Sequence, residues 1–170
     1  MTDPTFLSAV APATLSVGIL VLNGPNLNLL GQREPAVYGK STLADVEALC
    51  QSACLHEGFS LDFRQSNHEG ELIDAIHAAG KAQAAGTLAG MVLNAGAYTH
   101  TSIALHDAIK GTGLRTIELH ISNVYAREAF RHHSYISPVA AGVIAGFGIA
   151  GYGLAIEALA GLVRAEAAGR

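Results

Sequence analysis

Short apolar segments and longer amphipathic segments alternate along the chain. Short segments that end in glycine or polar residues have the apolar or alternating pattern of strands, and they span 17–22, 59–65, 90–93, 115–121 and 142–146. Most of them are apolar at consecutive positions, which is typical of strands covered on both faces. The pattern therefore predicts a sheet whose two faces are both buried.

Between these segments, apolar residues recur at the three- and four-residue spacing of a helix, over 42–57, 66–80, 101–111 and 151–166. Thr42 and Asp45 have the spacing of a capping box, as do Ser66 and Glu69, and Gly58 is placed to end the first helix. The alternation of strands and helices predicts an α/β fold in which one parallel sheet lies between two layers of helices.

Polar side chains follow four of the five predicted strands. They occupy Asn23 to Tyr38, Gln65 to Ser66, Asn94 to His100 and Glu118 to Ser122, with Arg127 and Arg131 one helical turn apart shortly afterwards. The first of these loops is much longer than the usual connection of about 4–6 residues, as binding loops and lids are. Because ligands bind outside the carboxyl ends of the strands in open α/β sheets, we expect the site at this edge.

Glu118 and His120 form the most informative pair of titratable residues. Side chains alternate along a strand, so both project from one face and Leu119 projects from the other. A carboxylate beside an imidazole fixes the ring tautomer and favours the protonated ring, which a general acid needs near neutral pH. A buried structural ion pair would have the same spacing, and the residues alone leave both interpretations open.

Tyr38 lies five residues beyond Arg33 on the first loop. A neighbouring guanidinium favours the phenolate, which can act as a base. The alternative interpretation is that Tyr38 packs the loop against the domain.

The composition narrows the class of partners. The formal charge is −4 and only 14% of the 170 residues are charged, without a basic stripe, so neither nucleic acid nor an anionic membrane surface is expected as a partner. Half of the residues are hydrophobic and the mean hydropathy is +0.32, which is high for a soluble monomer. We therefore expect a large subunit interface, or else a membrane, to cover the apolar surplus.

Cys50 and Cys54 are four residues apart in a predicted helix, where Cβ atoms lie about 5–6 Å apart, too far for an unstrained disulfide. We expect them to be core thiols of a cytoplasmic protein and not metal ligands. No Lys or Arg precedes Arg33, so the apolar N-terminal stretch lacks the charged region of a secretory signal. Residues 1–16 are expected to be an extension and 17–170 a single catalytic domain.

Two segments near the C-terminus suggest other structures. Residues 139–156 carry no charge and are long enough for a membrane helix, but five glycines interrupt them, which favours strand, turn and helix. Residues 146–151 match GxGxxG, a dinucleotide-binding pattern, but no further strand follows to complete the unit. Close packing of a turn on the sheet is the favoured interpretation, and a nucleotide- or flavin-binding module is the alternative function.

Four segments resemble the signature sequences of the type II 3-dehydroquinate dehydratase family: LNGPNLNLLGQREPAVYG, FRQSNHEGELID, LNAGAYTHTSIAL and IELHISNVYAREAFRHHSYISP. They occur in the family's order, and the resemblance extends over about 17–162. It implies a flavodoxin-like fold with a five-stranded parallel sheet. It also implies reversible trans-dehydration of 3-dehydroquinate to 3-dehydroshikimate through an enolate, in the shikimate or quinate pathway, without metal or cofactor.

The resemblance also implies catalytic roles. Tyr38 would be the base, with Arg33 stabilising its phenolate. Asn26 would hold the water that stabilises the enolate. His120, oriented by Glu118, would donate the proton with which the hydroxyl leaves.

Further residues would bind the substrate, by the same resemblance. Asn94, the backbone of Ile121 and Ser122, and the Ser122 hydroxyl would bind its carboxylate. The ring hydroxyls would be bound or framed by His100, Arg131 and Asp107, the last acting near a subunit boundary and serving either its own site or a neighbour's. The family's usual assembly is a dodecamer of four trimers, which would account for the apolar surplus. A catalytically silent oligomeric scaffold is a further alternative, against which the presence of Arg33, Tyr38 and His120 argues.

Overall fold

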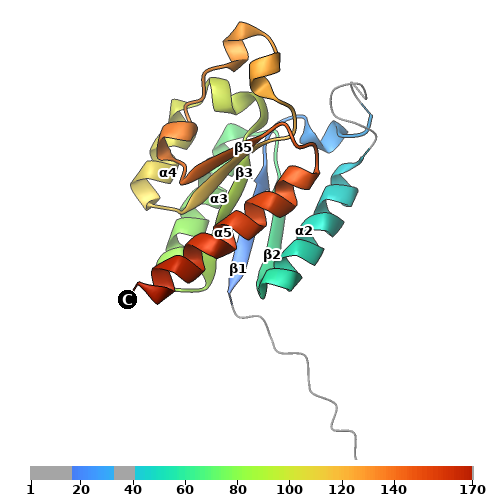
Figure 1. Ribbon diagram of the computed structural model, residues 1–170. Helices are drawn as coiled ribbons and strands as arrows, with labels where there is room; N and C mark the ends of the chain where they lie inside the picture. The colour runs from blue at the N-terminus through green and yellow to red at the C-terminus, as the bar shows by residue number, and fades with distance from the viewer. Residues whose placement is uncertain (1–16, 33–40, 170) are drawn as a thin grey trace, which may run out of the picture.

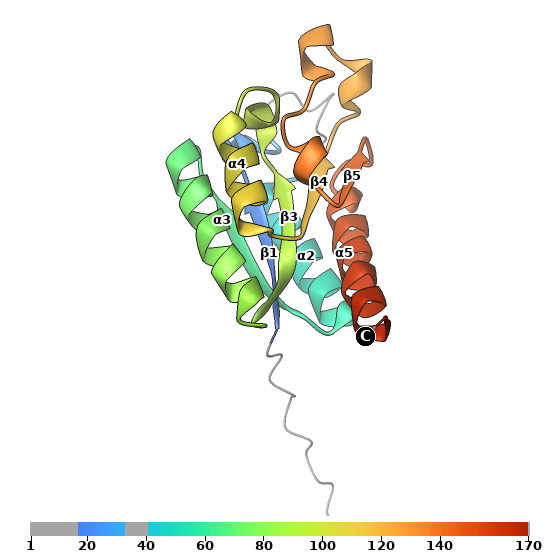
Figure 2. The same ribbon diagram turned by 90° about the vertical axis from the view of Figure 1, so that its left-hand side faces the viewer.

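The computed structural model describes residues 17–32 and 41–169, which form a parallel five-stranded sheet between two layers of helices (Figures 1 and 2). The strands are β1 Gly18–Asn23, β2 Ser60–Gln65, β3 Leu88–Asn94, β4 Thr116–His120 and β5 Gly142–Ala145. The α-helices are α2 Leu43–Glu57, α3 Glu69–Ala84, α4 Ile103–Thr112 and α5 Ala150–Ala168. The predicted α/β class and parallel sheet are confirmed.

The two faces of the sheet are covered by different pairs of helices. Helices α2 and α5 pack together over one face, and α3 and α4 over the other, as the side view in Figure 2 shows. Strands β1 and β3 are buried along nearly their whole length, which explains their continuous apolar sequence. Each helix layer has its own cluster of buried side chains, and the sheet separates the two.

The strand order is β2-β1-β3-β4-β5, which is the flavodoxin-like order that the resemblance implies. The order reverses between β1 and β3, where Asn23 pairs with Asn94 at the ends of the two strands. In such sheets the connections from neighbouring strands leave in opposite directions at this point, and a crevice opens between them. The topology therefore positions a site at the carboxyl ends of β1, β3 and β4.

The start of α2 agrees with its prediction, whereas the start of α3 does not. Thr42 caps α2 in a capping box with Asp45, and Gly58 ends the helix in the left-handed conformation. The predicted capping box between Ser66 and Glu69 is wrong. The Ser66 hydroxyl instead accepts from the His68 N–H and donates to Glu71 at 2.5 Å, so α3 begins after His68.

Helix α3 also runs beyond its predicted end at Gly80. A Cβ at Gly80 would lie 2.6 Å from the Thr112 Cβ, so this glycine permits close contact between α3 and α4 and does not end a helix. The helix continues to Ala84. Arg127 and Arg131 are not on one helix, because Arg127 is the residue after the short 3-10 segment Val124–Ala126 and Arg131 belongs to the separate segment Ala129–Arg131.

Residues 139–156 form a turn, the short strand β5 and the start of α5, as predicted. Among the described residues, no helix is long and apolar enough to cross a membrane. Cys50 and Cys54 are buried free thiols, as expected, and burial raises the pKa of Cys50 to about 12 and that of Cys54 to about 11. Such thiols carry little thiolate at neutral pH, which agrees with a packing role.

Candidate active site

A cavity of about 260 Å³ opens at the carboxyl edge of the sheet. Its walls come from the loop after β1, the segment after β3, and the end of β4 with the chain that follows it. The predicted site residues among its lining are Asn26, Asn94, His100, His120, Ile121, Ser122 and Arg131. Residues from three separate parts of the sequence therefore meet at the place where the strand order reverses.

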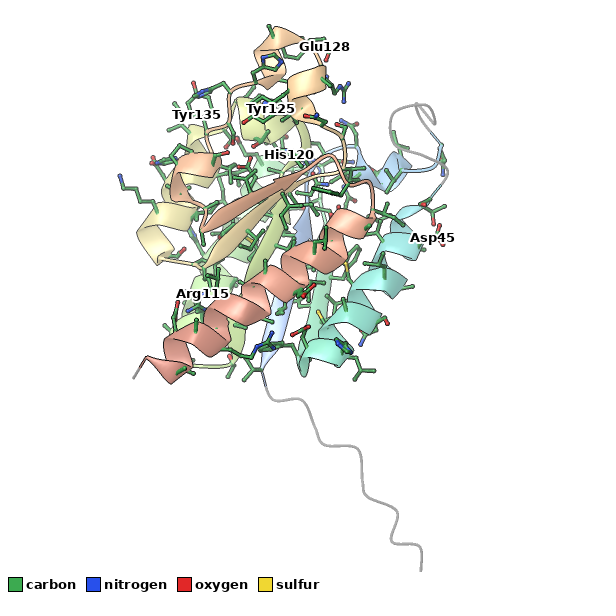
Figure 3. All side chains as sticks on the ribbon, viewed as in Figure 1. Asp45, Arg115, His120, Tyr125, Glu128 and Tyr135 are labelled. Carbon is green, nitrogen blue, oxygen red and sulfur yellow. The ribbon has the colours of Figure 1, made fainter. Side chains whose placement is uncertain are left out.

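His120 and Glu118 are in direct contact, as their spacing predicts. The His120 Nε2 lies 2.9 Å from the Glu118 Oε1, and the carboxylate is completely buried while the imidazole reaches the cavity. Figure 3 shows His120 at the end of β4, below the projecting segment that carries Tyr125 and Glu128. With Nε2 held by the carboxylate, Nδ1 is the ring nitrogen left to meet a ligand.

Three hydroxyl groups complete the surroundings of Glu118. Thr99 and Ser134 donate to Oε1 at 2.5 and 2.6 Å, and Ser137 donates to Oε2. The Ser134 Oγ also accepts from the N–H groups of Ile136 and Ser137, at 3.0 Å each, so its own hydrogen is directed to the carboxylate. The carboxylate thus accepts a hydrogen bond from each of the three hydroxyls.

These contacts keep Glu118 ionised in spite of its burial. Burial alone would raise the pKa of the Glu118 carboxyl. The hydrogen bonds from His120 and the three hydroxyls lower this pKa by more than burial raises it, and the result is about 2. A carboxylate that stays charged holds the imidazole in one orientation and can stabilise the imidazolium form. The pair is therefore suited to deliver a proton into the cavity.

His100 forms a second wall beside His120. The two rings are stacked with centroids 6.4 Å apart, and the His100 Nδ1 lies 2.7 Å from the His133 carbonyl oxygen. Burial lowers the pKa of His100, and the nearby His120 and Arg131 lower it further. His100 thus favours the neutral form, which suits a hydrogen-bonding role towards an uncharged hydroxyl.

Arg131 supplies positive charge to the cavity from the segment after β4. Its Nε lies 2.9 Å from the Glu128 Oε2, and this ion pair holds the guanidinium at the rim. Arg127 also lines the cavity and forms an ion pair with Glu128 at 3.5 Å. Two guanidinium groups at one rim favour an anionic ligand.

Asn94 lies at the floor of the cavity and is 4% exposed. Its Nδ2 donates to the Tyr152 hydroxyl at 2.9 Å, and its Oδ1 accepts from the Gly96 N–H at 3.3 Å. The Tyr152 hydroxyl in turn donates to the Asn23 Oδ1 at 2.6 Å. A buried chain of polar groups therefore continues from the cavity floor into the core.

Asn26 is held in position by the backbone of its loop. It has a positive φ of 65°, a conformation that Asn tolerates better than most residues, and its N–H donates to the Asn67 Oδ1 at 2.9 Å. The loop begins at Gly24, where a Cβ would lie 2.4 Å from the Ala95 carbonyl oxygen. Only glycine permits this approach, which brings the loops after β1 and β3 together.

Four predicted site residues are not among the lining residues of this cavity, and one of them is Glu118, which lies beneath it in contact with His120. Arg33 and Tyr38 lie outside the described residues, so their predicted roles stay predictions. Asp107 is exposed on α4 and is not among the lining residues of its own chain. This placement leaves a role in a neighbouring subunit's site as the open interpretation of Asp107.

Sequence reasoning missed the hydroxyls around Glu118 and the buried Tyr152. Thr99, Ser134 and Ser137 belong to segments rich in turn residues, where hydroxyl side chains are common, and Tyr152 follows a glycine turn within an apolar helix. The available signal was the presence of Thr99, Ser134 and Ser137 inside two of the family-like segments. Among the described residues, no cluster of three or more His, Cys, Asp or Glu side chains could hold a metal ion.

The GxGxxG turn is engaged in packing, as favoured. The N–H groups of Gly146 and Gly148 donate to the carbonyls of His120 and Ile121 at 3.1 and 2.9 Å. A Cβ at Gly151 would lie 2.9 Å from the Leu119 Cδ1. The N–H groups of these two glycines therefore bind the end of β4.

The model of the family described as dehydroquinase class II matches residues 17–160. The chain belongs to the class II dehydroquinase family. Relatives named 3-dehydroquinate dehydratase include one from Acidovorax sp. (strain JS42), 67% identical over 84% of this chain and 96% of its own length. Another, from Variovorax paradoxus (strain S110), is 69% identical over 83% of this chain and 97% of its own.

Solved structures agree with this membership of the dehydroquinase family. The type II dehydroquinase from Butyrivibrio crossotus superposes with a TM-score of 0.80 at 43% identity, covering 84% of this chain and 97% of that one. A 3-dehydroquinate dehydratase-like protein from Bifidobacterium longum superposes with a TM-score of 0.64 at 30% identity, covering 87% and 98%. As a class II dehydroquinase, the chain is an enzyme of the lyase class.

Proposed function

We propose that this protein removes water from 3-dehydroquinate to form 3-dehydroshikimate, by trans elimination and reversibly. A base takes the proton from the carbon next to the ketone, and the electron pair of that C–H bond forms an enolate. The C–O bond on the following carbon then breaks, the enolate electrons form the double bond of the enone, and the hydroxyl leaves as water with a proton from an acid. No oxidant, reductant or cofactor is needed to balance these steps.

The observation that carries this proposal is the Glu118–His120 pair at the cavity. A completely buried carboxylate with four hydrogen-bond donors orients an imidazole whose other nitrogen is left for a ligand. Such a pair can hold a proton and release it to a leaving hydroxyl. We assign His120 as the acid and Glu118 as the group that orients it.

The remaining assignments follow the family resemblance and are supported by the position of the residues. Asn94, the Ser122 hydroxyl and the backbone of Ile121 and Ser122 bind the substrate carboxylate, and Asn26 holds a water beside the enolate. These groups all line the same cavity. His100 and Arg131, also in its lining, bind or frame the ring hydroxyls.

The base is proposed to be Tyr38, with Arg33 stabilising its phenolate. This part of the proposal rests on the sequence, because both residues lie outside the described structure. A guanidinium beside a phenol favours the phenolate. A phenolate can act as the base that removes the proton from the carbon next to the ketone. Residues 17–170 would constitute the catalytic domain, with 1–16 as an extension.

We further propose a cytoplasmic enzyme of the shikimate or quinate pathway that assembles as a dodecamer of four trimers. Large apolar side chains exposed on the single chain support an extensive interface, among them Leu55, Ile103, Tyr125, Phe130 and Phe147. The exposed Asp107 on α4 would then reach the site of an adjacent subunit.

The test is to add 3-dehydroquinate to the purified protein and follow the ultraviolet absorbance of the conjugated enone. We expect a steady increase with the wild type and a loss of at least about 100-fold in kcat with His120→Asn, since a general acid is typically worth that much. His56→Asn, at the far end of α2, is the matched control and should keep wild-type turnover. No absorbance change with the wild type would refute the proposed reaction.

A further inference from the structure

We propose that Tyr152 is a positioning residue that fixes the side-chain amide of Asn94 towards the substrate, and that the 146–151 glycine turn exists to place it there. The inference rests on the proposed function, because it assumes that Asn94 binds the substrate carboxylate. It assigns a role to a fully buried tyrosine on α5 and to a glycine pattern that the reaction itself does not use.

The polarity of the buried chain is determined from its inner end. The carbonyl oxygen of Arg64 can only accept, so the Asn23 Nδ2 must donate to it, at 3.1 Å. The Asn23 Oδ1 therefore faces the Tyr152 hydroxyl, which donates to it at 2.6 Å. The phenol oxygen is then left to accept, and it does so from the Asn94 Nδ2 at 2.9 Å.

This sequence of donors and acceptors leaves Asn94 with one permitted orientation. Its Nδ2 faces Tyr152, its Oδ1 accepts from Gly96, and the second Nδ2 hydrogen remains for a ligand in the cavity. A carboxylate accepts hydrogen bonds and cannot donate them, so it needs this N–H and would be repelled by the amide oxygen. Burial also raises the pKa of Tyr152 above its ordinary range, so the phenol keeps its proton.

The glycine turn explains how a residue of α5 reaches the cavity floor. Gly151 packs so closely on β4 that a Cβ would lie 2.9 Å from the Leu119 Cδ1, and Tyr152 is the next residue. Gly146 has a φ of +92°, and a Cβ there would lie 3.1 Å from the Asn123 Cβ. The first turn of α5 is thereby held against the end of β4, within reach of Asn94.

The same turn orients the backbone at the end of β4. The carbonyls of His120 and Ile121 accept from the N–H groups of Gly146 and Gly148. Because a peptide unit is planar and trans, the N–H groups of Ile121 and Ser122 point away from the turn. The turn therefore holds both the backbone donors and, through Tyr152, the side-chain donor that we assign to the carboxylate.

The test is Tyr152→Phe in the full-length enzyme, which keeps the ring and removes the hydroxyl. We expect KM for 3-dehydroquinate to rise about tenfold and kcat to stay within about threefold. The reason is that the hydrogen bond from Asn94 to the carboxylate, which the variant weakens, binds substrate and transition state alike. Tyr125→Phe, an exposed tyrosine outside the cavity lining, is the matched control and should leave both constants unchanged. A purely structural role would lower the melting temperature without raising KM.

A second variant keeps the phenol intact. In Asn23→Leu the Tyr152 hydroxyl loses the acceptor that fixes the direction of its hydrogen, so the phenol oxygen is no longer held as an acceptor for the Asn94 Nδ2. The amide then keeps only its contact with the Gly96 N–H, and KM should rise as in Tyr152→Phe. If Tyr152→Phe does not fold, this variant answers the same question.

A double-variant cycle shows whether Tyr152 affects KM through Asn94 or independently of it. In the Asn94→Ala background, Tyr152→Phe should raise KM no further, because its effect passes through the amide that is already gone. A wild-type KM for Tyr152→Phe would overturn the inference, and so would KM effects that multiply in the double variant. In either case an active wild-type enzyme would still uphold the proposed reaction. An inactive wild type would instead refute the proposed function.

Discussion

At the scale of single residues, Glu118 combines complete burial with a charge, which is stable only because every hydrogen-bond donor around it is directed at the carboxylate. Thr99, Ser134 and Ser137 each contribute a hydroxyl, and His120 contributes a ring N–H. An unpaired charge at such a depth would cost several kcal/mol. The three hydroxyl groups therefore help to keep Glu118 ionised beside the His120 imidazole.

The first prediction concerns the carboxylate that orients the proposed acid. Glu118→Gln should lower kcat, because the neutral amide no longer offers the His120 ring an anionic acceptor. The measurement is the initial rate of enone formation at saturating 3-dehydroquinate. A wild-type kcat would show that Glu118 has a structural role alone.

The second prediction concerns acid stability. The Glu118 pKa lies at about 2 in the folded state, below its ordinary value of 4.5, so its contribution to stability is fully present above pH 4.5 and is lost as the pH falls towards 2. We expect Glu118→Gln to be less stable than the wild type by a few kcal/mol at pH 7, a difference that shrinks between pH 4.5 and 2. Urea unfolding at several pH values measures this, with the exposed Glu47→Gln as control. A difference that stays constant with pH would contradict it.

The third prediction concerns the proposed base. Tyr38→Phe should leave the circular dichroism spectrum unchanged and lower kcat by about 100-fold or more, because a positioned base is worth that much. Tyr125→Phe serves again as the control tyrosine. Near-wild-type turnover in Tyr38→Phe would assign the base to another residue.

At the scale of elements, two glycines of α5 occupy opposite environments. A Cβ at Gly151 would lie 2.9 Å from the Leu119 Cδ1, whereas nothing lies within 4 Å of a Cβ at Gly161. Gly151 is the second residue of α5, and Gly161 lies in the interior of the helix. The contact with Leu119 therefore decides the effect of an added methyl group at Gly151, and helix propensity decides it at Gly161.

The fourth prediction follows from this contrast. Gly151→Ala should destabilise the protein by about 1–3 kcal/mol through overpacking, and it should weaken substrate binding because Tyr152 is displaced. Gly161→Ala should instead stabilise by about 0.5–1 kcal/mol, since alanine is the better helix former. Thermal unfolding and KM of both variants provide the comparison. Equal stability of the two variants would show that β4 adjusts to the extra methyl group.

At the scale of the whole molecule, the single chain leaves both Asp107 and several large apolar side chains exposed. If Asp107 serves an adjacent site, its function exists only in the assembly. The fifth prediction is therefore that Asp107→Ala and His120→Asn, each impaired alone, regain activity when the two chains are expressed together. Mixed oligomers contain sites in which an intact His120 faces an intact Asp107 from a neighbour.

Analytical ultracentrifugation accompanies this complementation experiment. The proposed dodecamer should sediment with twelve times the mass of the 17.5 kDa chain. Co-expression without any gain in activity would place the action of Asp107 within its own subunit.

The local sequence determined which segments are strands and helices. Runs of consecutive apolar residues indicate strands that are buried on both faces, and the spacing of Thr42 and Asp45 indicates the start of α2. It also determined the Glu118–His120 contact, since alternation along a strand is a local rule. It failed at Ser66, whose hydroxyl found Glu71 instead of the backbone that it was expected to cap, and at Gly80, whose neighbour Thr112 lies on another helix.

Only the tertiary structure decided what surrounds the reacting groups. Thr99 and Ser137 each lie 19 residues from Glu118, and Tyr152 lies 58 from Asn94 and 129 from Asn23. Contacts over such separations depend on the strand order and on how closely α5 packs against β4, which no local pattern encodes. The chemistry of the pair could therefore be predicted from the sequence, whereas the groups that keep it charged and oriented appear when the sheet brings its carboxyl ends together.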